Sequence, residues 1–330
     1  MPAVLRAGRD ADAGGFIALV GTCWAEYPGC VMDLDGEVPE LRALASYYAG
    51  QGGALWVAEA DGRVVGMVAT KPLDGGAWEL CKMYAYSDQR GSGLAQSLAY
   101  AAEAHARVHG GGEMRLWSDT RFDRAHRFYE KCSYLRAGPI RALNDLSHSM
   151  EFEYAKPLTG SVVRRLDAAA AVSAVPRLAA ILKECVDAGG NLSFLAPLAA
   201  ACATTYCRRV AAQAARGERV VIAAWLDGML AGSVVVDLAQ PENQRHRAEF
   251  KKLMVAPAAR RRGLARRLLR EAEAAASEAG RDMLSLAAQQ GSDAERLYRS
   301  EGWICGGTMP DFSRAADGTR EAASLFWKRV

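Results

Sequence analysis

Hydrophobic residues along the chain fall into short runs in some stretches and into helical spacing in others. Two pairs of apolar runs, each interrupted by Asp-Gly, predict β-hairpins, at 55–58 with 64–69 and at 220–225 with 230–236. Leucine and alanine at spacings of four residues predict the buried face of a helix, at Leu94, Leu98 and Ala102 and again at Leu264, Leu268 and Ala272. The pattern therefore predicts strands and helices that alternate along the chain.

The same pattern occurs twice. Lys82-Met83-Tyr84-Ala85 precedes an Arg-x-x-Gly-x-Ala segment at Arg90, and Lys252-Leu253-Met254-Val255 precedes another at Arg260, 170 residues later. Short strands near 4–6 and 162–164 open the two halves, and strands near 114–117 and 283–286 follow the long helices. Because the matching segments keep their order, we interpret the chain as a duplicated domain.

Each half is predicted to be an α/β domain with a mixed, mostly antiparallel twisted sheet flanked by helices. Pro, Thr, Gly and Ser cluster between Lys156 and Ser161, as is typical of a join between domains. We therefore expect an N-terminal domain at 1–157 and a C-terminal domain at 162–330.

The amino-acid composition of the chain excludes several classes of protein. Of the 330 residues, 50% are hydrophobic and 24% charged, which excludes a mainly disordered chain. No apolar run reaches about eighteen residues, so we expect no membrane span and no membrane partner. Eight scattered cysteines without a Cys-x-x-Cys pair indicate reduced thiols and a cytoplasmic location. The histidines show no metal-ligand spacing, so no metal is expected, and the sequence leaves the oligomeric state open.

The Arg-x-x-Gly-x-Ala segment between a strand and a helix is suited to holding phosphate. The first N–H groups of a helix lack partners within it, and glycine lets a backbone approach an anion closely. A single copy is also compatible with a simple tight turn. Two copies, each with a Glu eleven residues before the Arg (Glu79 and Glu249), favour an anion site. The phosphate loop of nucleotide triphosphatases is absent.

With these turns, and with Leu297-Tyr298-Arg299-Ser300-Glu301-Gly302-Trp303 near the end, the chain resembles the GNAT superfamily of acetyl-CoA-dependent N-acetyltransferases. The first half has Phe128-Tyr129 in the corresponding place, with Ser133 where the family usually has glycine. The segments at 191–198, 246–253 and 310–312 resemble tabtoxin-resistance-type acetyltransferases, which acetylate the free amine of a small toxic amino acid.

The resemblance implies two tandem GNAT domains and acetyl-CoA as co-substrate. In this family the turn holds the pyrophosphate of CoA and the preceding strand lines its pantetheine arm. The implied cofactor-binding residues are Met83, Tyr84, Ala85, Arg90, Gly91, Ser92, Gly93, Leu94 and Ala95 in the first half, and Leu253, Met254, Val255, Arg260, Arg261, Arg262, Gly263, Leu264 and Ala265 in the second.

Four residues are candidates for catalysis. An acceptor amine must lose a proton before it attacks a thioester, and Glu79 and Glu249 are suited to accept it. Tyr129 and Tyr298 are suited to donate a proton to the departing thiolate. The structural alternatives are carboxylates paired with a neighbouring Lys or Arg, and tyrosines that only pack on the sheet.

The second half carries an arginine cluster on and after its turn, at Arg260, Arg261, Arg262, Arg266, Arg267 and Arg270. We interpret the cluster as CoA-binding rather than as a nucleic-acid site, because it lacks interleaved aromatic residues. We therefore expect the C-terminal domain to bind acetyl-CoA more tightly and to carry most of the transfer.

The leading hypothesis is an N-acetyltransferase that moves the acetyl group of acetyl-CoA to a primary amine, by direct attack with both reactants bound. A small-molecule acceptor is favoured, and a protein acceptor remains open. The rival hypothesis is a non-catalytic CoA-binding or scaffolding module. Acceptor specificity is expected to come from the segments at 23–48 and 187–208.

Overall fold

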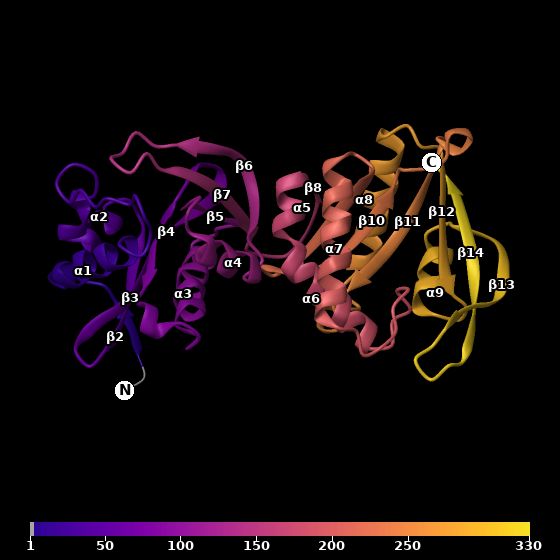
Figure 1. Cartoon of the computed structure of the whole chain (residues 1–330), viewed down its shortest axis with the longest axis horizontal. Helices are drawn as coiled ribbons and strands as arrows, with labels where there is room; N and C mark the ends of the chain where they lie inside the picture. Colours follow the sequence, from indigo (N-terminus) through magenta and orange to yellow (C-terminus); the bar gives the residue numbers. More distant parts are fainter. Residues whose placement is uncertain (1–2) are drawn as a thin grey trace. The chain divides into compact units, whose positions relative to one another are not determined.

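Each half of the chain forms one mixed sheet of seven strands, and the strand order is the same in both (Figure 1). The computed structural model describes residues 3–330. The first sheet runs β1-β2-β3-β4-β5-β7-β6 and the second β8-β9-β10-β11-β12-β14-β13. Neighbouring strands are antiparallel except at β4–β5 and β11–β12, which are parallel. The predicted pair of mixed, mostly antiparallel α/β domains is confirmed.

The strands of the two halves correspond in order. Those of the first half are β1 (Val4–Ala7), β2 (Ala54–Ala60), β3 (Arg63–Pro72), β4 (Ala77–Ala85), β5 (Glu113–Asp119), β6 (Leu135–Ala142) and β7 (Met150–Pro157). Those of the second are β8 (Ser161–Leu166), β9 (Arg219–Leu226), β10 (Met229–Asp237), β11 (Arg247–Val255), β12 (Met283–Gln289), β13 (Ile304–Arg314) and β14 (Arg320–Arg329).

The helices follow the same repeat, although the segments before the hairpins differ. The first half has α1 (Ala13–Trp24), α2 (Leu44–Ala49), α3 (Leu94–Val108) and α4 (Asp123–Lys131), with the short 3-10 helix η2 (Pro39–Ala43) before α2. The second half has α5 (Ala168–Ser173), α6 (Val175–Asp187), α7 (Ala200–Ala215), α8 (Leu264–Glu278) and α9 (Asp293–Ser300).

The two Asp-Gly hairpins form as predicted. Asp61 and Gly62 have φ values of 50° and 73°, and Asp227 and Gly228 have values of 48° and 85°. Positive φ at both central residues is the requirement of a type I′ turn, whose twist matches that of the flanking strands.

The long helices α3 and α8 pack on the sheets through the predicted faces. Leu94, Leu98 and Ala102 are buried on α3, and the corresponding residues of α8 are buried too. A glycine in the strand below each helix allows this approach, because a Cβ on Gly66 would lie 3.1 Å from Leu98 of α3 and one on Gly232 would lie 3.2 Å from Leu268 of α8. The helix that follows the turn is therefore fixed closely against the sheet.

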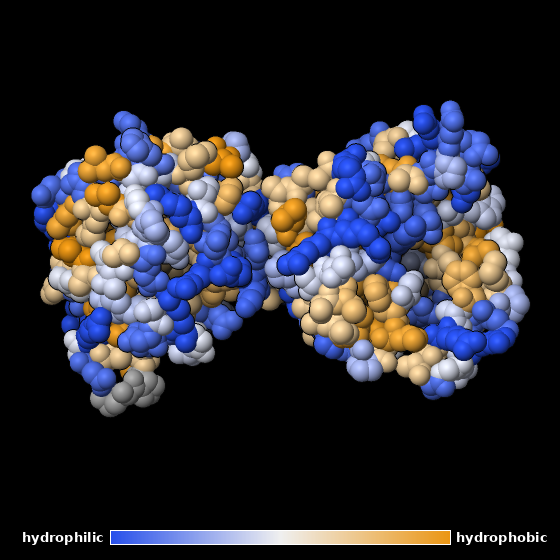
Figure 2. All heavy atoms as spheres, in the orientation of Figure 1, coloured by the Kyte–Doolittle hydropathy of each residue, from blue (hydrophilic) through white to orange (hydrophobic). Residues whose placement is uncertain are grey.

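The chain divides into two compact units between Thr159 and Gly160. On the face that Figure 2 shows, hydrophilic side chains cover much of each unit, with apolar ones in small groups between them. All eight cysteines lie among residues 3–330 and are free thiols. Within the same residues, no helix is both long and apolar enough to cross a membrane.

Candidate active site

The two parallel strands of each sheet separate after a short ladder. In the first unit β4 pairs with β5 from Ala77 to Glu79 only, while β4 itself continues to Ala85. In the second, β11 pairs with β12 from Arg247 to Glu249 and continues to Val255. The edge of β4 or β11 beyond that point is therefore not paired with the next strand, and it leads directly to the turn.

A β-bulge bends each of these strands at a lysine. The register between β3 and β4 shifts between Met67 and Ala69, and that between β10 and β11 shifts between Ser233 and Val235. Lys82 has a φ of 48° and Lys252 a φ of 54°, which are uncommon for a residue other than glycine. Bulges redirect side chains and are frequent beside active sites.

The turns have the backbone geometry of an anion cradle. Gly91 and Gly93 have φ values of 79° and 85°, and Arg261 and Gly263 have values of 62° and 77°. No heavy atom lies within 4 Å of a Cβ built on Gly91 or on Gly263. The space in front of the N-termini of α3 and α8 is therefore open to a phosphate group, which the unpaired N–H groups there favour.

The arginines of the second turn are partly engaged with protein groups. Arg266 and Arg270 form ion pairs with Glu301, at 2.5 and 2.9 Å, and Arg267 donates to Ser161. Arg262 lies 3.8 Å from Asp227. In the first unit Arg90 forms an ion pair with Glu26. Several arginines of the second half therefore already have partners. This weakens the expectation, based on charge, that the second half holds the anion more tightly than the first.

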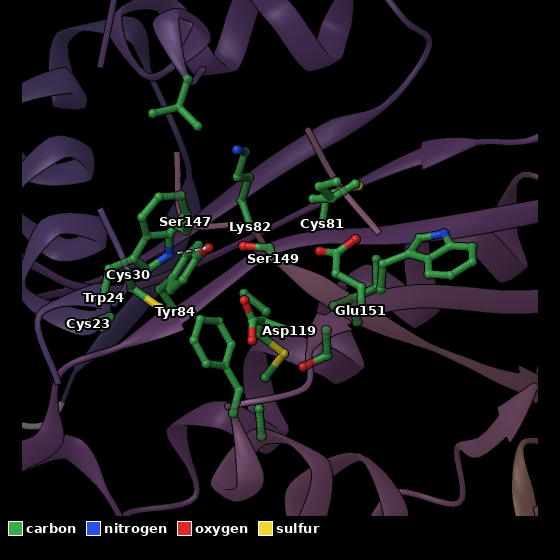
Figure 3. Close-up of a pocket in the computed structure, with 18 of the residues that line it drawn as sticks. Cys23, Trp24, Cys30, Cys81, Lys82, Tyr84, Asp119, Ser147, Ser149 and Glu151 are labelled. Atoms are coloured by element: carbon green, nitrogen blue, oxygen red, sulfur yellow. Dashed lines mark hydrogen bonds between the residues drawn. The ribbon is translucent and has the colours of Figure 1, made fainter. Parts of the chain in front are cut away.

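The first unit holds a cavity of about 500 Å³ at the bulge. Its wall includes the separated edge of β4 from Leu80 to Ala85, and also Glu79 and Tyr129. In Figure 3 Lys82, Asp119 and Glu151 lie around the cavity on different elements, and the Lys82 amine points away from the two carboxylates. Residues from the predicted acceptor segment, including Trp24, Glu40 and Tyr48, also line it. The structure therefore brings together around one cavity six of the first unit's candidates, Glu79, Met83, Tyr84, Ala85, Arg90 and Tyr129, whereas the turn residues 91–95 are not among its lining.

The two candidate catalytic residues of the first unit are held in different ways. Glu79 lies 3.5 Å from Lys71, and its side chain is 20% exposed. Tyr129 on α4 is buried among Tyr134 and Tyr154, and burial raises its pKa well above the usual value. Tyr129 therefore keeps its proton at neutral pH, as a proton donor must.

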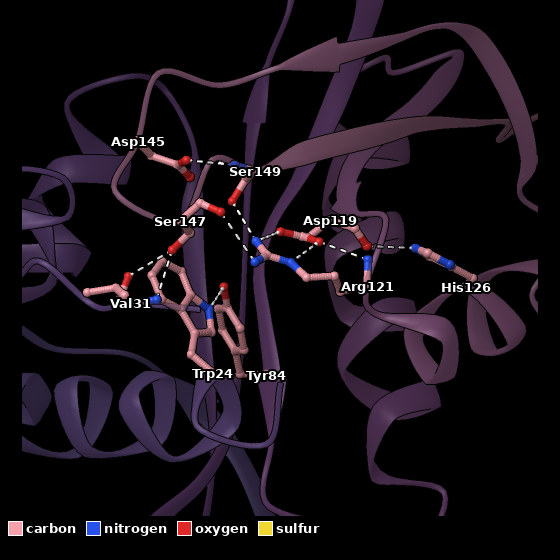
Figure 4. Close-up of polar contacts among 9 residues, drawn as sticks. All are labelled: Trp24, Val31, Tyr84, Asp119, Arg121, His126, Asp145, Ser147 and Ser149. Carbon is pink, nitrogen blue, oxygen red and sulfur yellow. Dashed lines mark hydrogen bonds and ion pairs between the residues drawn. The ribbon is translucent and has the colours of Figure 1, made fainter. Parts of the chain in front are cut away.

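Sequence reasoning missed a polar network that anchors the far wall of the cavity (Figure 4). Arg121 pairs with Asp119 through two hydrogen bonds and also donates to the carbonyl oxygen of Ser147 (3.3 Å) and to Ser149 Oγ (2.9 Å). Burial tends to raise the pKa of Asp119, but the bonds from Arg121 outweigh it and hold the pKa below its usual value. The segment at 117–122 was the available signal, since it departs from the second half's sequence.

The second unit arranges the corresponding residues differently. Glu249 pairs with Lys251 at 3.0 Å, and its side chain is 44% exposed. Tyr298 on α9 is buried against Trp303 and Phe326, and burial raises its pKa well above the usual value. A cavity of about 20 Å³ lies at this bulge, lined by Lys252, Met254 and Tyr206 among others.

Comparison with known proteins agrees with this geometry. The "Acetyltransferase (GNAT) family" profile matches residues 20–134, and the "Acetyltransferase (GNAT) domain" profile matches residues 217–305. The chain belongs to the GNAT acetyltransferase family. It contains two GNAT domains in tandem, hereafter the first and the second domain. The narrower likeness to tabtoxin-resistance enzymes stays a sequence-based prediction.

Individual relatives are more distant. The uncharacterized N-acetyltransferase YjgM of Escherichia coli (strain K12) is 41% identical over 75 residues, which are 22% of this chain and 45% of YjgM. The match to the ribosomal-protein-alanine N-acetyltransferase of Brucella melitensis covers 51% of this chain and 99% of that enzyme's chain, with a TM-score of 0.43 and 22% sequence identity. The putative acetyltransferase yncA of Salmonella typhimurium, solved with acetyl-CoA, matches 52% of this chain and 94% of its own, with a TM-score of 0.43 and 16% identity.

Among residues 3–330, no group of three or more His, Cys, Asp or Glu side chains is arranged to hold a metal ion.

Proposed function

We propose that the first domain transfers the acetyl group of acetyl-CoA to the primary amine of a small, positively charged molecule. The observation that carries this proposal is the cavity of about 500 Å³ where the separated edge of β4, Glu79 and Tyr129 meet. Such a volume is typical of small-molecule sites. The proposal departs from the sequence-based expectation that the second domain does most of the work.

The residues at the turn are suited to acetyl-CoA. The open space at Gly91 and the N-terminus of α3 would hold the pyrophosphate. The separated edge of β4 at Met83, Tyr84 and Ala85 would take the pantetheine arm in place of a neighbouring strand. We extend the same assignment to Gly263 and to the edge of β11 in the second domain. Acetyl-CoA, when bound, supplies the activated acetyl group.

The chain's own residues would handle the protons. Glu79 is placed to take the proton of the acceptor ammonium, directly or through water. Its carboxylate lies 3.5 Å from the Lys71 amine and is 20% exposed, so an acceptor in the cavity can reach it. Tyr129 keeps its own proton for the departing thiolate, because burial raises its pKa. Holding both reactants in one cavity supplies proximity without a covalent intermediate.

The charge of the cavity wall supports a cationic acceptor. Seven carboxylates line the cavity against four cations: Glu26, Glu37, Glu40, Glu79, Asp119, Asp145 and Glu151, with Lys71, Lys82, Arg90 and Arg141. Arg121 and Arg124, which lie outside this lining, pair with Asp119 and Glu26 and reduce the surplus of negative charge. The excess that remains attracts a substrate that carries a positive charge besides the reacting amine. Trp24, Tyr27 and Phe122 on the same wall offer ring faces to such a cation.

A thiol-release assay tests the proposal. Acetyl-CoA and the full-length protein are incubated with a diamine, a monoamine of similar length, and an amino acid whose second group is a carboxylate. We expect the diamine to give the highest kcat/KM. Preference for the carboxylate-bearing amine would exclude a cationic acceptor, and absence of thiol release with every amine would favour the non-catalytic alternative.

A further inference from the structure

The two bulge lysines occupy the same position in the two domains but have opposite electrostatic surroundings. Lys82 in the first domain forms an ion pair with Glu40 of η2 at 2.8 Å. Lys252 in the second donates to the neutral hydroxyl of Ser193 at 2.9 Å. The rings of Phe194 and Tyr206 lie 5.4 and 5.5 Å from the Lys252 amine. One lysine is thus paired with a carboxylate, while the other lies beside a pair of aromatic rings that contact each other.

Because of this difference in surroundings, the pKa values of the two amines shift in opposite directions. Burial, together with the cations Lys251 on β11, Arg219 on β9 and Arg209 on α7, lowers the pKa of Lys252 to about 8, against a smaller opposing effect of Glu249. Burial also acts on Lys82, but Tyr84 and Glu40 outweigh it, so the pKa of Lys82 lies above its usual value. Near pH 8 about half of the Lys252 amine is neutral and nucleophilic, whereas Lys82 stays an ammonium.

The position of Lys252 matches that of a reacting amine. Its counterpart Lys82 lines the first domain's cavity together with Tyr129. Lys252 immediately precedes Leu253, Met254 and Val255, the edge proposed to take the pantetheine arm. The small cavity at this bulge is lined by Lys252 itself with Met254 and Tyr206. The amine of Lys252 therefore lies at the bulge that corresponds to the one beside the first domain's cavity.

We infer that Lys252 is an acetylation site of this protein, modified by acetyl-CoA bound in the same domain. This inference rests on the proposed binding of acetyl-CoA by the second domain. The neutral Lys252 amine attacks the thioester carbonyl carbon, a C–N bond forms and the C–S bond breaks. The amine proton leaves to the thiolate or to water, so the products are Nε-acetyl-lysine and CoA thiol. The modification removes one positive charge from the group formed with Lys251, Arg209 and Arg219.

Peptide mass mapping of the full-length protein after incubation with acetyl-CoA tests this inference. We expect the Lys252 peptide to gain one acetyl group at a rate that rises with pH through about 8, while the Lys82 peptide stays unmodified. Glu40→Gln removes the partner of Lys82 and should make that lysine reactive too. Gly263→Val should stop acetylation of Lys252 by acetyl-CoA, because the side chain fills the open turn and strains its positive φ.

A second readout uses no acetyl-CoA. Trace labelling with acetic anhydride across the pH range reports the reactivity of each amine. We expect Lys252 to titrate near 8 in wild type and in Gly263→Val, and Lys82 to titrate above its usual range. An unmodified Lys252 after incubation with acetyl-CoA, or equal acetylation of both lysines, overturns the inference. Thiol release with free amines by a Glu249→Gln, Tyr298→Phe variant reports the first domain separately, so failure here leaves the proposed function standing.

Discussion

Ser133 follows α4 with a φ of 70°, and its counterpart Gly302 has a φ of 78°. The backbone therefore needs a left-handed residue at this position in both domains, and Ser133 adopts it without being glycine. A residue with a side chain loses about 1–2 kcal/mol in this conformation. The serine that departs from the family pattern thus keeps the geometry at a cost in stability.

Replacing this serine tests that cost. We expect Ser133→Gly to raise the free energy of unfolding by about 0.5–1 kcal/mol, because relief of strain exceeds the added entropy of the unfolded chain. Gly302→Ser is the matched control and should lower the stability of the second domain by a similar amount. Urea denaturation followed by intrinsic fluorescence measures both. A destabilising Ser133→Gly would show that the hydroxyl matters more than the backbone.

Tyr129 is expected to act at thiolate departure rather than in binding. We expect Tyr129→Phe to lower kcat by about 10- to 100-fold while the affinity for acetyl-CoA changes less than about twofold. Steady-state kinetics with a diamine and titration calorimetry with acetyl-CoA separate the two effects. A fall in acetyl-CoA affinity with unchanged kcat would instead make Tyr129 a packing residue.

At the scale of elements, the contact between the long helix and the sheet depends on one glycine in each domain. A Cβ on Gly66 meets side-chain atoms of Leu98 and Leu94 at 3.1 and 3.3 Å, and the carbonyl oxygen of Tyr84 at 3.2 Å. A Cβ on Gly232 meets the carbonyl oxygen of Met254 at 2.7 Å, and a backbone atom cannot rotate away.

These contacts predict that Gly232→Ala destabilises its domain more than Gly66→Ala does. Overpacking typically costs about 1–3 kcal/mol, and we expect the two variants to fall at opposite ends of that range. Thermal unfolding of the full-length variants, compared with wild type, gives the order. Equal losses would mean that β11 shifts as easily as the side chains of α3.

The segment between β6 and β7 is held against the cavity by Arg121, whose guanidinium joins Asp119 to Ser147 and Ser149. We expect Arg121→Lys to speed amide exchange at 143–149 and to raise the KM for the amine several-fold, because lysine cannot bond in this forked way. Arg127→Lys, at an exposed position of α4, is the matched control. Unchanged exchange in both variants would contradict an anchoring role.

Most strands and helices of the fold could be predicted from local sequence signals. Asp61-Gly62 and Asp227-Gly228 predicted the hairpins, because few other dipeptides accept two positive φ values. The register shifts at Lys82 and Lys252 were not predicted, since lysine has no preference for a left-handed backbone and the bulge depends on pairing with β3 and β10. Backbone propensity depends on a residue and its neighbours along the chain. A bulge depends on how two strands pair, so local propensity does not predict it.

The candidate site also has a part that could be predicted from the sequence and a part that could not. The turn and the edge of β4 were predicted because they are contiguous in sequence and occur twice. The wall formed by Asp119, Ser149 and Glu151, with Arg121 behind it, was missed, because it joins the ends of β5 and β7 with the segment before β7. Those residues show no shared pattern along the chain, and only tertiary contacts bring them to one cavity.

At the scale of the whole molecule, duplication has given two domains with one topology and different surroundings at the bulge. The first leaves a cavity of about 500 Å³ there, and the second places Lys252 beside two aromatic rings and a cavity of about 20 Å³. We therefore expect free-amine acetylation in the first domain and self-modification in the second.

The most direct test compares two full-length double variants with the same diamine and acetyl-CoA. One carries Glu79→Gln with Tyr129→Phe, and the other carries Glu249→Gln with Tyr298→Phe. Initial rates of thiol release, corrected for release without amine, are the measurement. We predict that the first pair of substitutions abolishes amine-dependent release and that the second leaves most of it. Loss of release in the second variant with retention in the first would contradict the assignment and place free-amine acetylation in the second domain.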